Sequence, residues 1–314
     1  MSLKEDLENI EVEVDGESCH LFGVWMMTKF FWLGGLCNLT NIWGAISLSL
    51  GIFGNWTILG HHGCHGGLKG FDRLTYGRGM DRIISWLDWW DARGWSYEHN
   101  HLHHYFLSEG KDPDLVERNL EWLRESKMSY FSKSAVVLFL ATSWKWIYYA
   151  PNINENSKIK YFPQKEYIFF YYLLVPYYYY LRGYNYAIFW MMLVEVITNM
   201  HSFLVIVPNH AGDDMYRFDS GCEVYSSEFY RRQIVSSVNF SYGNDVVDYL
   251  HGWLNYQIEH HIYPDKGLLW YRKAAPKVEA VCAKHGIKYV KESVFIRLKK
   301  TVDIMIGRAS MLKE

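Results

Sequence analysis

Apolar residues along the chain are concentrated in four long runs, at about 20–36, 42–60, 166–182 and 186–207. Each run is close to the roughly 17–25 residues that a helix needs to cross a bilayer. The runs come in pairs, because only CNLTN (37–41) separates the first two and only RGYN (182–185) separates the last two. Connections this short join neighbouring antiparallel helices. The pattern therefore predicts two transmembrane helical hairpins, about four transmembrane helices in all.

A fifth apolar run, 134–150, contains Lys145 between two tryptophans and is predicted to be an interfacial helix rather than a crossing. With four crossings, the segments 61–165 and 208–314 have their polar parts on one side of the membrane. Both are rich in Lys and Arg, whereas the two hairpin turns carry only Arg182, so the positive-inside rule puts this side in the cytosol. We therefore expect an all-α integral membrane protein with a cytosolic helical cap.

The composition agrees with a membrane protein that also has a large water-facing part. Half of the residues are hydrophobic and 18% are aromatic, including 14 Trp and 25 Tyr, whose rings suit the membrane interface. The mean hydropathy is nevertheless slightly polar. A net charge of -2 provides no basic surface for nucleic acid, so we expect no such partner. The five cysteines lack paired spacing and are predicted to be free thiols.

The two ends of the chain are expected to be cytosolic. The first twenty residues contain seven carboxylates and one lysine, the opposite of a signal or transit peptide. Residues 1–19 are therefore predicted to be an acidic cytosolic N-terminal segment, and residues 266–314 a cytosolic C-terminal segment. No Gly/Ser-rich linker, repeat or low-complexity tract marks a boundary, so residues 1–314 are predicted to form a single domain.

Clustering of the 14 histidines is the main chemical signal. They gather at GHHGCHGG (60–67), EHNHLHHYF (98–106), NHAGDD (209–214) and QIEHHIYPD (257–265). At 3.6 residues per turn, His61 and His65 share one face of a helix. Gln257 falls on the same helix face as His260 and His261. Each of the three clusters that contain an HH pair lies just outside an apolar segment and can turn two or three imidazoles towards one point.

Such clusters indicate a metal site, because imidazole binds iron, copper, zinc and nickel. Eight histidines are candidate ligands: His61, His65, His99, His103, His104, His210, His260 and His261. Eight exceed the roughly six ligands that an octahedral ion accepts, so two metal ions are expected. His62 and His101 lie inside the clusters but off the shared faces and are set apart. Four more lie outside the ligand spacings: His20, His201, His251 and His285.

The clusters resemble the three histidine boxes of the membrane fatty acid desaturase superfamily. WLNYQIEHHIYP (253–264) resembles the third box of the front-end and bacterial acyl-lipid desaturases, in which Gln takes the place of the first His. EHNHLHHYFLSEGKDPDL (98–115) resembles their second box and its Gly-x-Asp-Pro-Asp-Leu continuation. The resemblance covers about residues 42–265. In the first box, His62 stands where the family usually has an acidic residue.

The resemblance implies that the eight histidines bind two iron ions in the cap, with O2 as co-substrate. Zinc offers no redox states, whereas iron with open positions can activate dioxygen. Gln257 is expected to be a weak ligand or a donor to metal-bound water. His210, preceded by Asn209, corresponds to the isolated ligand after the last membrane helix. Gln257, Asn209 and Glu259, which lies inside the third box, are the residues expected to assist catalysis.

The expected reaction is desaturation of a fatty acyl chain in a lipid or thioester, in the endoplasmic reticulum or the bacterial inner membrane. No His-Pro-Gly-Gly haem motif occurs in the sequence, so the electrons are expected from a separate cytochrome b5 or ferredoxin. A hydroxylase, ketolase or decarboxylating oxygenase would use the same ligands. A zinc-dependent membrane hydrolase or a non-catalytic metal-binding membrane protein remains the alternative from another class. Product analysis and metal content distinguish them.

Three acidic residues near these features have further interpretations. Asp112 and Asp114, around Pro113, are expected to be turn and helix-capping residues. Glu195 falls inside an apolar run, where a carboxylate is costly and functional by default. We expect it to pair with Lys29 of the first run and to close the end of an acyl tunnel. The alternative is a structural ion pair with no role in substrate length.

Overall fold

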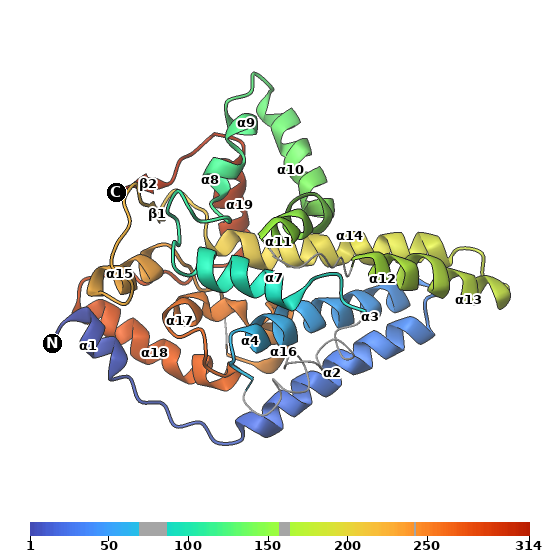
Figure 1. Cartoon of the computed structure of the whole chain (residues 1–314), viewed down its shortest axis with the longest axis horizontal. Helices are drawn as coiled ribbons and strands as arrows, with labels where there is room; N and C mark the ends of the chain where they lie inside the picture. Colours follow the sequence, from blue (N-terminus) through green and yellow to red (C-terminus); the bar gives the residue numbers. More distant parts are fainter. Residues whose placement is uncertain (69–86, 157–163, 242) are drawn as a thin grey trace. The chain divides into compact units, whose positions relative to one another are not determined.

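The computed structural model describes residues 1–68, 87–156, 164–241 and 243–314, and it is mostly helical (Figure 1). Two short strands, β1 (Tyr216–Arg217) and β2 (Leu312–Lys313), pair in parallel. The chain folds into two compact units, each made of segments that are distant in sequence. The first unit consists of 1–17, 99–140 and 203–314, and the second of 18–98 and 141–202. The single domain over 1–314 stays a prediction.

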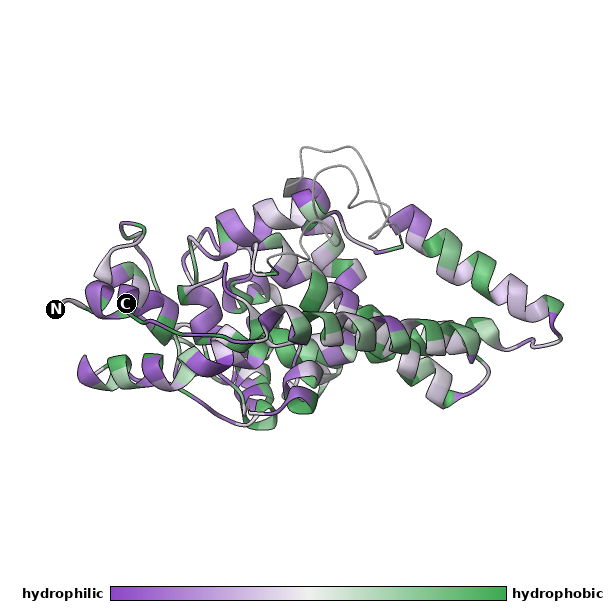
Figure 2. Cartoon of the chain, turned by 90° about the horizontal axis from the view of Figure 1, so that it is seen from below, coloured by the Kyte–Doolittle hydropathy of each residue, from purple (hydrophilic) through white to green (hydrophobic). Residues whose placement is uncertain are grey.

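The described part of the second unit consists of long apolar helices joined to shorter helices and helical turns. Hydrophobic residues recur along these helices (Figure 2). In chain order they are α2 (Glu17–Cys37), α3 (Ile42–Phe53), the π-helical turn η1 (Gly54–Gly60), α4 (His61–Cys64), α7 (Ala92–Ser96), the π-helical turn η3 (Lys145–Tyr149), α11 (Ala150–Asn156), α12 (Gln164–Ile168), the π-helical turn η4 (Phe169–Leu174), α13 (Val175–Leu181) and α14 (Ala187–Ile206).

Two helices in the described part of the chain are long and apolar enough to cross a membrane, Ile42–Cys64 and Ala187–Asn209. They correspond to two of the four predicted crossings. The other two runs, 20–36 and 166–182, are also helical, as α2 and as α12 to α13. Their passage through a membrane stays a prediction, as does the interfacial position of 134–150.

The hairpin formed by α2 and α3 is tight because small residues lie at the helix contact. A side chain at Gly35 would overlap the backbone of Leu48, and one at Gly51 would overlap the backbone of Trp32. Asn41 fixes the start of α3 by accepting hydrogen bonds from two backbone N–H groups of its first turn. Small residues at such positions let helix backbones approach closely in a membrane.

One face of α2 is apolar and exposed. Phe22, Met26, Phe30 and Leu33 recur at spacings of three and four residues, and their exposed fractions lie between 48% and 72%. A continuous apolar stripe of this kind marks an interaction surface on a protein. It is the face that lipid would cover if α2 crosses the bilayer.

The buried carboxylate of Glu195 is not paired with Lys29, so that prediction is wrong. Five side chains contact the Glu195 carboxylate as donors: Lys145, Trp146, Tyr167, Tyr172 and Asn199. Lys29 instead donates to the Oδ1 atom of Asn55 at 2.6 Å. Lys145 is 1% exposed and supplies the charge that Glu195 needs, because η3 packs against α14 at this point. The lysine that interrupts the fifth apolar run is therefore the buried partner.

The first unit is built of shorter helices around the third histidine box. In chain order they are α1 (Leu3–Glu8), the π-helical turn η2 (Tyr97–His103), α8 (Val116–Asn119), α9 (Glu121–Arg124), α10 (Tyr130–Trp144), η5 (Val207–Asn209), α15 (Ser227–Val235), α16 (Asp245–Leu250), η6 (Leu254–Tyr256), α17 (Gln257–Ile262), α18 (Leu268–Lys284) and α19 (Val294–Met305). Helix α10 continues beyond the unit.

A compact apolar core packs against the side of α17 that carries Ile258 and Ile262. Ile258 and Ile262 of α17 pack in one cluster with Leu7 of α1 and Val278 of α18, and these side chains are at most 6% exposed. Tyr263, which directly follows α17, donates from its hydroxyl to the backbone carbonyl of Leu7 at 2.7 Å. The two apolar positions of QIEHHI therefore anchor the helix, and its polar positions remain available for a site.

Candidate metal centre

The second histidine box lies in a π-helical turn rather than in a regular α-helix. Residues Tyr97–His103 form η2, and the backbone N–H of His104 donates to the carbonyl of His99 at 3.0 Å. Hydrogen bonds from i to i+5 bring side chains five residues apart onto one face. The Nε2 atoms of His99 and His104 accordingly lie 3.2 Å apart. His99, His103 and His104 are buried, whereas His101 is exposed.

His210, which directly follows η5, and His261, near the end of α17, lie next to each other. Their Nε2 atoms lie 3.2 Å apart, and the side-chain amide nitrogen of Gln257 lies 2.9 Å from His210 Nε2. One ring nitrogen from each of His103, His210 and His261 falls within 4.8 Å of the others. Three histidines from three separate clusters therefore converge on one point within the first unit. The rings of His260 and His104 are also neighbours, with centroids 5.0 Å apart.

The outer nitrogens of four imidazoles bond to groups around the site. His103 Nδ1 lies 2.9 Å from a carboxylate oxygen of Asp112, and His210 Nδ1 lies 3.0 Å from the carbonyl oxygen of Ser236. His261 Nδ1 lies 3.0 Å from Gln233 Oε1, and His260 Nδ1 lies 3.4 Å from the Tyr271 hydroxyl. A carboxylate, a carbonyl or an amide oxygen only accepts, so the first three imidazoles carry their proton on Nδ1 when neutral.

This arrangement leaves electron pairs of several Nε2 atoms directed at one another, which a bound cation would stabilise. Metal-binding histidines characteristically donate their other N–H group to a carboxylate, carbonyl or similar acceptor. Burial, and then the charge on His103, lower the pKa of His210 to about 3, so this imidazole is neutral at physiological pH. Burial likewise lowers the pKa of His104 well below its usual value. A buried set of neutral imidazoles fits iron and other first-row transition metals.

Asp112 is a site residue that the sequence interpretation missed. It was expected to act in a turn, and its carboxylate does accept from the backbone N–H groups of Ser108 (2.7 Å) and Asp114 (2.8 Å). The same carboxylate also pairs with His103. Burial is the largest single effect and opposes the charged form of His103, but the charge and the hydrogen bond of Asp112, together with the charge of Asp114, outweigh burial and raise the pKa of His103. The DPD sequence after the second box was the available signal.

Gln257 and Asn209 are connected within the site. The side-chain nitrogen of Asn209 donates to the Gln257 carbonyl oxygen at 3.0 Å and to the backbone carbonyl of Leu254 at 3.1 Å. These bonds direct the amide nitrogen of Gln257 towards His210. Asn209 therefore orients Gln257 and holds α17 close to the end of α14.

Glu259 lies away from the converging imidazoles. Its carboxylate accepts from Asn239 Nδ2 at 2.8 Å and from the Tyr289 hydroxyl at 2.9 Å, on the opposite side of α17 from His261. Burial raises the pKa of Glu259 to about 7. These neighbours fix the position of Glu259 on α17, and the catalytic role expected from sequence stays a prediction.

His61 and His65 belong to the second unit. They lie at the end of the helix that contains α3, with ring centroids 5.2 Å apart, so one helix end presents both. His62, which was set apart, is fully buried beside His61.

Three histidines outside the boxes have other neighbours. His201 stacks on Phe53, with centroids 3.9 Å apart. His285 bonds to the Asp6 carboxylate at 2.5 Å, and His251 Nδ1 lies 2.8 Å from the carbonyl oxygen of Val247. These contacts support their separation from the ligand set.

Comparison with known proteins gives one family. Residues 39–293 match the family model described as fatty acid desaturase. The chain is 37% identical over 105 residues to the Acyl-lipid (9-3)-desaturase of Physcomitrium patens, which covers 33% of this chain and 18% of that protein. No solved protein structure matches the chain.

Two longer alignments cover most of the chain. Identity to the sn-1 linoleoyl-lipid 6-desaturase of Arthrospira platensis is 22% over 276 residues, covering 80% of this chain and 73% of that protein. Identity to the NADPH-dependent stearoyl-CoA 9-desaturase of Mycobacterium tuberculosis is 26% over 241 residues, which covers 68% of this chain and 56% of that protein. The alignment to the Physcomitrium patens desaturase, in contrast, spans less than a fifth of that protein's length.

Proposed function

Because the chain belongs to the fatty acid desaturase family, we propose that it is a membrane oxidoreductase that uses O2 to introduce a double bond into a fatty acyl chain. One observation carries this proposal for the chain itself. Imidazoles from His103, His210 and His261 converge, and each has its outer nitrogen fixed by a neighbouring acceptor. Neighbouring acceptors commonly fix the outer nitrogens of ligating imidazoles in this way in transition-metal sites.

We propose that two iron ions are held by the eight histidines predicted from the sequence: His61, His65, His99, His103, His104, His210, His260 and His261. Bound iron would supply the oxidising power needed to remove hydrogen from an unactivated methylene group. Asp112, Ser236, Gln233 and Tyr271 keep four of the imidazoles in fixed orientations. Because these four partner residues are buried, they shield the outer nitrogens of the imidazoles from water.

Gln257 is proposed to bind weakly to the metal or to donate from its amide nitrogen to metal-bound water. The contact of that nitrogen with His210 supports this position. Asn209 keeps the Gln257 amide in the orientation that exposes its nitrogen. Gln257 would supply the amide N–H as a hydrogen-bond donor beside His210, and Asn209 would hold that amide in place.

The proposed substrate is an acyl chain carried by a lipid or a thioester. The names of the relatives include acyl-lipid, linoleoyl-lipid and stearoyl-CoA desaturases, which supports the acyl chain as the shared element. We further propose that the electrons come from an external carrier, a cytochrome b5 or a ferredoxin. The metal site is proposed to face the cytosol of a multi-pass membrane protein.

Metal analysis, O2 uptake and mass spectrometry of acyl chains test the proposal together. The purified chain is expected to contain about two irons. When supplied with a reduced electron carrier, it is expected to consume O2 only with an acyl substrate and to yield a product two hydrogens lighter. His261→Ala should lose iron and activity. His101→Ala, at an exposed histidine of the second box, should retain both.

Other outcomes would identify other functions. A product heavier by one oxygen would instead establish a hydroxylase. Zinc without O2 uptake would refute the oxygenase altogether.

A further inference from the structure

The C-terminal helix α19 packs against the segment that presents His210, and it contacts η5, the turn just before that histidine. Ala211, the next residue, is fully buried. Its carbonyl oxygen lies 3.3 Å from Arg297 Nη2. The Thr301 hydroxyl bridges the same oxygen and the backbone carbonyl of Arg297, at 2.9 Å from each. Two side chains of one helix therefore hold the carbonyl that directly follows a candidate ligand.

The guanidinium of Arg297 lies directly against the backbone of this segment. Arg297 is fully buried, and a Cβ at position 212 would overlap its Nη2 atom, so Gly212 is required for this approach. Nη2 also contacts the sulfur of Met215 at 2.8 Å. The arginine thus follows the segment from Ala211 to Met215.

Two carboxylates keep the buried arginine in place. Arg297 Nη1 pairs with Asp214 at 2.6 Å and with Glu292 at 3.4 Å. Lys300 pairs with the same two carboxylates, at 2.9 Å and 3.0 Å. Because a buried charge is costly unless it is paired, these carboxylates determine where the guanidinium lies. They hold it where Nη2 reaches the Ala211 carbonyl.

His210 needs such contacts more than the candidate ligands in η2 and α17 do. Those histidines lie in helical backbone, whereas residues 210–215 belong to no helix or strand. The bond between His210 Nδ1 and the Ser236 carbonyl orients the ring, but it does not fix the backbone that carries the ring. The contacts from α19 supply that restraint, because they hold the main chain one residue after His210.

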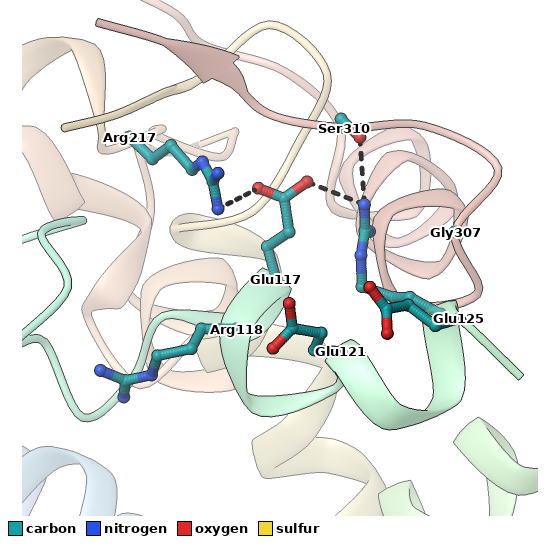
Figure 3. A pocket seen from close by; sticks show the side chains of 8 residues that line it. Glu117, Arg118, Glu121, Glu125, Arg217, Gly307 and Ser310 are labelled. Atoms are coloured by element: carbon teal, nitrogen blue, oxygen red, sulfur yellow. Dashed lines mark hydrogen bonds and ion pairs between the residues drawn. The ribbon is translucent and has the colours of Figure 1, made fainter. Parts of the chain in front are cut away.

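Arg124 fixes the opposite end of α19. From α9 it donates to the backbone carbonyl of Ala309 at 3.2 Å and to the carboxylate of Glu117 at 2.8 Å. In the charged pocket of Figure 3, Glu117 and Ser310 are both partners of this arginine. Arg124 therefore anchors the turn that follows the helix, whereas Arg297 lies in the first turn of the helix.

We propose that Arg297 and Thr301 are positioning residues for His210. They act through the carbonyl of Ala211, which restrains the backbone beside the candidate ligand. This inference rests on the proposed function, because it needs a metal ion where the three imidazoles of the first unit converge. Loss of these contacts would let His210 shift and would distort the coordination of that ion. A purely structural role would change only the stability of the fold.

Titration of the full-length protein with Co2+ in lipid nanodiscs, after chelation of any bound metal, tests the inference without turnover. The d–d absorption of bound Co2+ reports the geometry of its ligands. Arg297→Met should raise the Kd for Co2+ by about tenfold, as expected for a residue that orients a ligand, and should alter the absorption of the metal-saturated protein. Lys300 remains to pair with the two carboxylates.

Arg124→Met is the matched control, because it makes the same substitution at the other end of α19. It should leave the Co2+ spectrum unchanged and alter the Kd by less than about twofold, since it does not act on a ligand. Equal effects of Arg297→Met and Arg124→Met would overturn the inference, because they would show only that α19 stabilises the fold.

Thr301 provides a milder pair of variants, which decides the matter if Arg297→Met proves unstable. Thr301→Val removes the hydroxyl at nearly unchanged shape and should raise the Kd for Co2+ and alter the spectrum. Thr301→Ser keeps the hydroxyl and should behave as the wild type does. A wild-type Kd and spectrum in Thr301→Val would overturn the inference.

Co2+ binding by the wild-type protein separates this inference from the proposed function. If the wild type binds no Co2+, the proposed metal centre is wrong, and the proposed function fails with it. If the wild type binds Co2+ and the α19 variants bind it with the same Kd and spectrum, only the positioning role is wrong.

Discussion

At the scale of single residues, Asp112 combines two tasks that are usually separate. It closes the turn after the second histidine box, where Ser108 adopts a φ of 59° that is rare for a residue other than glycine. It also fixes the ring of His103. Such backbone strain persists only where the surroundings determine it. The turn and the ring of His103, a proposed metal ligand, therefore depend on the same carboxylate.

Asp112→Asn should weaken iron binding by about 10- to 100-fold, because it removes the negative charge that orients and polarises His103. Competition with an iron chelator of known affinity measures this change. Asp15→Asn is the control, since it makes the same change at an exposed aspartate of the N-terminal segment. Equal affinities for Asp112→Asn and the wild type would show that the contact does not act on the metal.

Glu195→Gln should destabilise the protein by about 3–5 kcal/mol, because it leaves Lys145 charged and buried without its counter-ion. Thermal unfolding in detergent, followed by tryptophan fluorescence, measures the loss. Replacing both partners, as Lys145→Met with Glu195→Leu, should recover much of the stability. If the double variant is no more stable than Glu195→Gln, the ion pair is not the cause.

At the scale of elements, both membrane-proximal histidine boxes coincide with π-helical turns. η1 directly precedes His61, and η2 contains His99 and His103. The spacing argument from sequence assumed regular α-helices, which have 3.6 residues per turn. It selected His61, His99, His103 and His104, which are buried, but set apart His62, which is also buried. It could not identify the turn that brings His99 and His104 together, because i to i+5 bonding depends on the packing of the segment.

Gly35→Leu should disrupt the α2–α3 hairpin, whereas Gly23→Leu on the same helix should have little effect. A side chain at Gly35 meets the backbone of Leu48, but a Cβ at Gly23 meets no described atom within 4 Å. Overpacking typically costs about 1–3 kcal/mol, and more where backbone is displaced. Thermal unfolding of both variants in the same detergent provides the comparison. Similar melting temperatures would contradict the close approach.

At the scale of the whole chain, the first unit joins residues that are far apart in sequence. Asp6 of α1 contacts Lys284 and His285 after more than 270 intervening residues. Leu7 packs against the back of α17, which carries the third histidine box. The acidic N-terminal segment was expected from its charge to be cytosolic and polar. Its apolar positions give it a structural role that charge alone did not reveal.

Asp6→Asn should lower stability at pH 7, and the difference from wild type should shrink as the pH falls below the unfolded pKa of about 3.9 and through the lower folded pKa. Hydrogen bonds from Lys284 and then His285 lower the pKa of Asp6. A depressed carboxyl pKa stabilises the fold above the unfolded value, near 3.9, and this contribution is lost as the pH falls through the folded pKa. Unfolding temperatures at several pH values test this. Glu13→Gln, at an exposed carboxylate of the same segment, should show no such dependence.

The sequence by itself determined which apolar runs form helices, two of which are long and apolar enough to cross a membrane in the described part of the chain. It also determined which histidines were candidates to bind metal. Both are local properties, because apolar periodicity and ligand chemistry are read within one segment. The tertiary structure decided the partners: Lys145 rather than Lys29 for Glu195, Asp112 for His103, and Asn239 with Tyr289 for Glu259. Those pairings depend on how distant segments pack, since a buried polar group bonds to whatever acceptor or donor the folded chain brings within reach.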